Sequence, residues 1–145
     1  MDIYQYIEKA TKASRDKSFA RSGQLTLGEI INKIELIIKD KPELPTVIYD
    51  FEYLFPTEID SWRGSYDELA LNYSTEGTQL YADGFLKILK DTVGKKLEGY
   101  KGGEYVMTES TPVWVANYGN SGNTAVLDVI DGGYQIILIT GYREF

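Results

Sequence analysis

The first group of residues suited to binding chemistry combines aromatic rings, a cation and a glycine within a few positions. Trp62 and Tyr66 offer flat ring faces for a base, and Arg63 offers a forked cation for a phosphate or carboxylate. Gly64 lets the backbone approach a ligand, and Asp67 could bind a base edge or ribose hydroxyls. The segment therefore suits a nucleotide. The alternative is that both rings cover the core and Arg63 pairs with a nearby carboxylate.

A second, glycine-rich segment could bind an anion. The backbone amides of Gly102 and Gly103, with the cation of Lys101 between the rings of Tyr100 and Tyr105, could hold a phosphate. The segment lacks the Gly-x-x-x-x-Gly-Lys-Ser/Thr pattern of a P-loop. The alternative is a connector from helix to strand that needs glycine for its shape.

A third segment reads as a strand with two distinct faces. Side chains alternate along a strand, so Trp114 and Ala116 share one face while Val115 and Asn117 share the other. One face packs in the core, and the other could line a pocket in which Asn117 binds a base edge or ribose hydroxyls. The alternative is that Trp114 is a core residue.

The absence of cysteine and histidine excludes much of catalytic chemistry. Zinc sites with Cys or His ligands, thiol nucleophiles and Ser-His-Asp triads need these residues. Catalysis through carboxylates with a divalent metal stays open as a third possibility. Its candidates cluster in one region without a diagnostic spacing: Asp50, Glu52, Glu58, Asp60, Asp67 and Glu68.

The net charge of −7 argues against general binding to nucleic acid, which rewards a basic surface. An acidic surface can serve solubility alone. It can also imitate nucleic acid, in which case Glu58 and Asp60 are candidates for contacting a protein target. No apolar run is long enough to span a membrane, and the first residues lack a secretory pattern. We therefore expect a cytoplasmic protein.

Three helices are predicted to support these segments. The first runs from Asp2 to about Ser14, and the second follows a capping box formed by Thr26 and Glu29. The third spans about 81–93 and stops near a glycine.

Strands are predicted over 46–51, 68–73, 111–118, 124–130 and 134–140, with residues 53–65 as a long loop. Connectors rich in Asn, Asp and Gly join the last three as hairpins. The predicted fold is α+β: one domain over 1–145 that has an antiparallel sheet with a C-terminal three-stranded meander and about three helices on one face.

Several segments, taken in order, resemble a group of small, poorly characterised proteins of phages, prophages and some bacteria. The matching segments are Leu25–Glu29, Ser61–Ala70, Gly99–Tyr105 and Pro112–Ala116. The resemblance covers about Leu25 to Gly122 and leaves residues 1–22 outside it. It implies a phage-type origin and directs attention to the three aromatic segments.

The hypothesis that joins these observations is a non-enzymatic binding protein without cofactor or metal. It would form a homo-oligomer and sequester a nucleotide-type signal of host immunity, as a phage-encoded sponge. Trp62 with Tyr66 or Tyr100 would hold the base, and Arg63, Lys101, Gly102 and Gly103 would hold the phosphate. The main alternative is an acidic inhibitor that binds a host defence protein or a nucleic-acid-binding protein.

Overall fold

The computed structural model describes residues 23–51, 54–74, 76, 79–99, 102–117 and 122–144. Within these ranges lie two helices and eight strands. In chain order they are α2 (Leu27–Ile38), β1 (Thr46–Tyr49), β2 (Phe55–Ser61), β3 (Leu69–Ser74), α3 (Ala82–Thr92), β4 (Lys96–Glu98), β5 (Glu104–Val106), β6 (Val113–Val115), β7 (Thr124–Asp131) and β8 (Gln135–Tyr142). The helix predicted from Asp2 to Ser14 lies outside the described residues.

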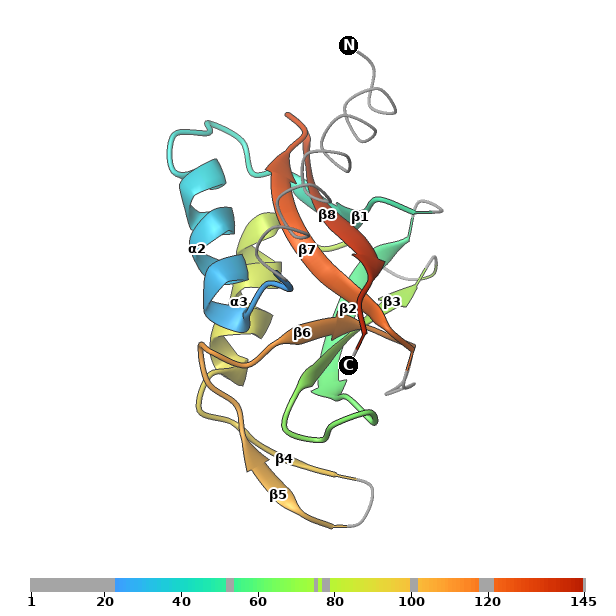
Figure 1. Cartoon of the computed structure of the whole chain (residues 1–145). Coiled ribbons are helices and arrows are strands. Elements are labelled where there is room, and N and C mark those ends of the chain that lie inside the picture. The colour runs from blue at the N-terminus through green and yellow to red at the C-terminus, as the bar shows by residue number, and fades with distance from the viewer. Residues whose placement is uncertain are drawn as a thin grey trace.

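Six strands form one strongly curved, mixed sheet in the order β1-β8-β7-β6-β3-β2 (Figure 1). The β1–β8 and β3–β6 pairs are parallel, and the other three pairs are antiparallel. The outer strands β1 and β2 come close to one another, so the sheet is nearly closed into a barrel. The remaining strands, β4 and β5, form a separate antiparallel hairpin that projects from it.

The predicted fold class is therefore wrong. The sheet is mixed rather than antiparallel, and α2 and α3 lie together at one end of a barrel-like structure instead of covering one face of an open sheet (Figure 1). Strands β6, β7 and β8 do neighbour one another in antiparallel order, but parallel strands flank them on both sides. Local patterns did not reveal these parallel pairs, because both join strands far apart in the sequence.

Strand β2 replaces most of the loop predicted over 53–65. Its sequence contains Pro56, Glu58 and Asp60, which are unusual in a central strand. The pairing with β3 shifts register between Pro56 and Ile59, and β2 is the last strand of the sheet. A proline is tolerated at such an edge because its missing N–H breaks no central ladder.

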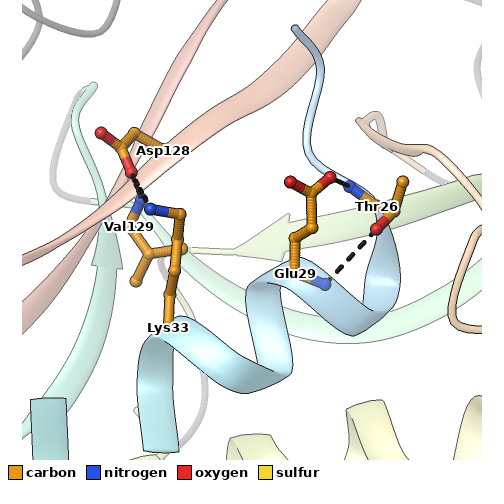
Figure 2. Close-up of polar contacts among 5 residues, drawn as sticks. All are labelled: Thr26, Glu29, Lys33, Asp128 and Val129. Atoms are coloured by element: carbon orange, nitrogen blue, oxygen red, sulfur yellow. Dashed lines mark hydrogen bonds and ion pairs between the residues drawn. The ribbon is translucent and has the colours of Figure 1, made fainter. Parts of the chain in front are cut away.

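The predicted capping box opens α2 and is confirmed. The Thr26 hydroxyl accepts a hydrogen bond from the Glu29 amide at 3.3 Å, and the Glu29 carboxylate accepts one from the Thr26 amide at 3.1 Å (Figure 2). One turn further on, Lys33 lies 3.2 Å from Asp128 of β7. These contacts fix the start of α2 and tie the helix to the barrel wall.

The helices close one end of the barrel. The amide of Leu27 donates to Thr111, just before β6, and the amide of Ala82 donates to Pro45, just before β1. Both helices send apolar side chains, including Ile30 and Phe85, into the main core between the strands. The other end, where β1, β3, β6 and β8 finish and β2 and β7 begin, is called the barrel mouth below.

Candidate functional site

The two tryptophans stack on one another. The ring centroids of Trp62 and Trp114 lie 4.2 Å apart, with an interplanar angle of 11°. Both side chains are buried, and with Ala70, Ala116 and other small or apolar residues they form a cluster separate from the main core. The Trp114 indole N–H donates to Glu68 at 2.9 Å. The rings therefore pack against protein, as the core alternative for both residues proposed.

The turn after β2 folds tightly around Trp62. The Trp62 amide donates to the Glu68 carbonyl at 2.8 Å, and the Ser65 amide donates to the Trp62 carbonyl at 3.2 Å. A Cβ placed on Gly64 would overlap with the Trp62 ring. Within this turn Arg63 is exposed, and the Asp67 carboxylate accepts a hydrogen bond from the Ser65 hydroxyl. Gly64 is thus required by the close approach of backbone to indole.

The β4–β5 hairpin meets the same turn through a pair of tyrosines. The ring centroids of Tyr66 and Tyr105 lie 6.2 Å apart. A Cβ on Gly99 would lie 2.7 Å from the Tyr66 ring, so the glycine makes room for that tyrosine. Gly102 has φ +82 in the hairpin turn, and the Gly103 carbonyl accepts from the Gly99 amide at 2.8 Å. The glycine-rich segment is a hairpin tip rather than a connector from helix to strand.

The three aromatic segments therefore do come together, but in pairs. The segment around Trp62 meets the β6 segment through the tryptophan stack with Trp114. It meets the glycine-rich segment through the contact of Tyr66 with Tyr105. Tyr100 and Lys101 lie outside the described residues. Asn117 is in a different place, at the barrel mouth, and Arg63 is not among the residues that line that mouth. Of the candidate ligand contacts, Asn117 is the one among the described residues that line the mouth, and a ligand shared by all three segments stays a prediction.

The barrel mouth holds a pocket of about 230 Å³. Phe51 and Tyr73 contribute half-buried aromatic rings, and Asn117 contributes an exposed amide. The pocket is completed by residues of β6, β7 and the segments beside them: Val115, Ala116, Gly122 and Thr124. These lining residues are all uncharged at neutral pH. The mouth therefore offers an apolar, partly aromatic surface with a few hydrogen-bonding groups.

An aromatic cluster forms one wall of this pocket. Phe51 stacks on Tyr49 with ring centroids 5.1 Å apart, and Tyr73 meets Phe51 edge to face at 5.8 Å. The Tyr49 hydroxyl lies inside the barrel and donates to the carbonyls of Leu71 and Asn72 at 3.2 and 3.0 Å. Burial, with a smaller contribution from Tyr73, raises the pKa of Tyr49 well above its ordinary value. The neutral phenol thus links β1 to β3 beneath the mouth.

Asp50 fixes the chain that carries Phe51. Its carboxylate accepts hydrogen bonds from the Thr140 hydroxyl at 2.6 Å and from the Thr140 amide at 3.1 Å. Its own amide donates to the Leu138 carbonyl at 3.1 Å. These three bonds bind the end of β1 to β8, so Phe51 is presented from an anchored turn.

Asn117 supplies the polar group most open to a ligand. It is exposed at the pocket rim, and the described part of the chain gives its side-chain amide no hydrogen-bond partner. The Gly122 carbonyl, just before β7, accepts a hydrogen bond from the Trp62 indole N–H at 3.1 Å. The buried tryptophan pair therefore supports the part of the pocket formed by the ends of β6 and β7, which also carries Asn117.

Sequence reasoning found Asn117 but missed Phe51, Tyr73 and Thr124 as partners. The sequence predicts separate strands for Phe51 and Tyr73 and gives no reason to place the two residues together. The parallel pairing of β3 with β6 and the closeness of β1 to β2 bring these strand ends to one mouth. The sequence carried one signal for this pair, because each residue lies at or beside the end of its strand: Phe51 follows β1, and Tyr73 is the last residue but one of β3.

The carboxylates considered for metal or acid–base chemistry have structural partners in several cases. Asp50 binds Thr140, Asp60 accepts from the Asn72 amide at 2.7 Å, and Glu68 accepts from Trp114. Over the described ranges, no group of three or more Asp or Glu side chains is arranged to hold a metal ion. Glu52 lies outside those ranges.

Comparisons with known protein families, with curated proteins and with solved structures find no match. The resemblance to small phage and bacterial proteins stays a prediction. Among the described residues, neither helix has the length and apolar character needed to cross a membrane.

Proposed function

We propose that this protein is a binding protein that takes the base of a nucleotide-type ligand in the barrel mouth. The observation that carries this proposal is the juxtaposition of the Phe51 and Tyr73 rings with the exposed amide of Asn117 around one pocket. The mouths of barrels are common places for small-molecule sites, because strand ends there present side chains around a concave surface.

The size and charge of the pocket favour a base over a phosphate group. At about 230 Å³ the pocket is below the roughly 300 Å³ at which pockets for drug-sized ligands begin, so it suits a group of one or two fused rings. The lining residues that the structure describes include no cation to bind a phosphate. The sugar and phosphates of a nucleotide would therefore extend out of the mouth.

The chemistry of the lining residues fits a planar polar group. Aromatic rings contribute stacking or edge contacts, and an asparagine amide offers both donors and an acceptor to a base edge. The Thr124 hydroxyl can add one more hydrogen bond. Tyr142, paired with Thr124 across the β7–β8 ladder, places an exposed ring at the same end of the barrel.

Isothermal titration calorimetry with adenosine, guanosine, cytidine, uridine and their monophosphates tests this proposal. We expect one of them to bind, and Asn117→Ala to weaken that binding roughly five- to tenfold through loss of about 1 kcal/mol of hydrogen bonding. Asn32→Ala makes the same chemical change on the exposed surface of α2 and should leave the affinity unchanged. Equal effects of the two substitutions, or no binding of any probe, would contradict the assignment.

The prediction that the ligand is a host immune signal needs a separate experiment. The purified protein is incubated with lysate from defence-activated cells and then heated, and the released small molecules are identified by mass spectrometry. An intact nucleotide supports sequestration, whereas a converted product indicates an enzyme. Recovery of no small molecule favours the alternative of a protein-binding inhibitor. The cytoplasmic location and the phage origin of the protein also stay predictions.

A further inference from the structure

Leu36 is an unusual residue for the surface of α2, because 74% of it is exposed. The residues of α2 that face the core are Leu27, Ile30, Ile31 and Ile34. Leu36 lies away from that stripe, whereas its neighbours Ile37 and Ile38 are half-buried and pack against the main core. Leu36 is therefore the part of the apolar surface of α2 that the core does not cover.

A shallow groove lies beside Leu36 where α2 meets α3. Its volume is about 650 Å³, and its apolar lining comes from Leu36, Ile38 and Leu86. Both helices contribute to it, so the groove runs over the outer surface of the helix pair. This surface is at the end of the barrel away from the mouth (Figure 1).

The charges around the groove favour a second copy of the same chain. The whole chain carries −7, which makes two copies repel in general. The groove departs from this trend, because it is lined by one acid, Glu35, and two lysines, Lys39 and Lys90. Lys90 lies 3.6 Å from Glu35 across the two helices. Both signs are therefore present on one patch, as a self-complementary contact requires.

We propose that a second copy of this chain docks on the α2–α3 groove to form a two-fold symmetric dimer. In such a contact the same patch meets itself, so Leu36 packs against Leu36 of the second copy. A two-fold axis beside Leu36 sets Glu35 of each chain against Lys39 of the other. The barrel mouths point away from this interface, so both remain open to ligand.

Sedimentation velocity of the full chain over roughly 1 to 100 μM tests the dimer. We expect the mass to rise from 16.4 kDa to twice that value with concentration. Leu36→Asp should raise the dimer dissociation constant by about tenfold or more, because an apolar residue at the centre of a contact is replaced by a charge. Leu44→Asp, at a partly exposed leucine outside the groove, is the matched control and should leave it unchanged.

Charge exchange gives a second readout that does not depend on apolar packing. Glu35→Lys and Lys39→Glu should each weaken self-association, whereas an equimolar mixture of the two variants should restore a mixed dimer. A wild-type chain that stays at 16.4 kDa at the highest concentration would overturn the proposal and leave the groove for a different protein. Equal effects of Leu36→Asp and Leu44→Asp would also overturn it.

Discussion

The indole rings of Trp62 and Trp114 lie nearly parallel, 4.2 Å apart, although 51 residues separate them in the chain. Trp62 precedes the turn that follows β2, and Trp114 is the central residue of β6. Their contact joins that turn to the sheet, and the Trp62 N–H continues the connection to Gly122 at the barrel mouth. Trp62 and Trp114, each a separate candidate for contacting a ligand, are therefore part of the framework that shapes the pocket.

Replacing Trp62 should destabilise the protein strongly. Trp62→Ala removes a fully buried side chain, so we expect the free energy of unfolding to fall by about 3–5 kcal/mol. Trp62→Phe keeps an aromatic ring and should have a smaller effect. Urea unfolding followed by circular dichroism measures both. A loss below about 1 kcal/mol for Trp62→Ala would show that the tryptophan pair does not support the fold.

Two glycines should respond in opposite directions to substitution by alanine. Gly64→Ala would place a methyl group into the Trp62 ring, and we expect a loss of about 1–3 kcal/mol in unfolding free energy. Gly84→Ala lies within α3, where the new Cβ has its nearest neighbour at 3.7 Å. It should gain about 0.5–1 kcal/mol from higher helix propensity. Thermal unfolding compares the two variants, and a similar change in both would contradict this account.

Tyr49 should make the protein sensitive to alkaline pH. Burial raises the pKa of its hydroxyl in the folded state, so only the unfolded chain ionises readily near its ordinary value of 10.0. The stability contributed by the neutral phenol is thus fully present below pH 10.0 and is lost as the pH rises above it.

Tyr49→Phe separates this effect from the hydrogen bond. At neutral pH the variant should lose about 1 kcal/mol, because the bond to the Leu71 and Asn72 carbonyls is gone. Its unfolding free energy should then fall less steeply above pH 10.0 than that of the wild type. Parallel pH profiles from urea unfolding would contradict the burial of a neutral Tyr49.

The ion pair between Lys41 and Asp131 should contribute weakly and only above acidic pH. Partial burial acts to raise the pKa of Asp131, but the hydrogen bond from Lys41, the Gly133 amide and the lysine charge outweigh it and lower the pKa below 3.8. The contribution is therefore present above pH 3.8 and is lost as the pH falls through the lower folded-state value.

Lys41→Met tests this contribution. Because Asp131 is largely exposed, solvent screens the pair, and we expect the variant to lose less than about 1 kcal/mol at neutral pH. The difference from the wild type should disappear in strong acid and shrink in high salt. If the variant's loss of unfolding free energy is the same in strong acid and in high salt as at neutral pH, the lost packing of the lysine stem is responsible rather than the lost charge.

The sequence predicted well the elements whose signals are local. The capping box of Thr26 and Glu29 marked the start of α2, and the apolar period of α3 placed Phe85 and Leu89 in the core. Strand β2 escaped prediction because Pro56 and its acidic neighbours are typical of loops, and an edge strand tolerates them.

The candidate site was only partly predictable for a different reason. Asn117 was found from strand alternation, but its neighbours Phe51 and Tyr73 come from strands that reach the mouth through long-range pairing. Conversely, Trp62 and Trp114 were expected to share their faces with a ligand and instead share them with one another. Residue types showed which side chains could bind, whereas only the topology showed which of them meet.

The central claim, that the barrel mouth is the ligand site, is tested most directly by nuclear magnetic resonance. Proton–nitrogen correlation spectra of the labelled protein are recorded during titration with the nucleoside monophosphate that binds best. We predict that the backbone amide signals of Val115, Asn117 and Thr124 shift, while those of Arg63 and Tyr66 stay in place. Shifts confined to Arg63 and Tyr66, or spectra that do not change with any probe, would contradict a ligand site at the barrel mouth.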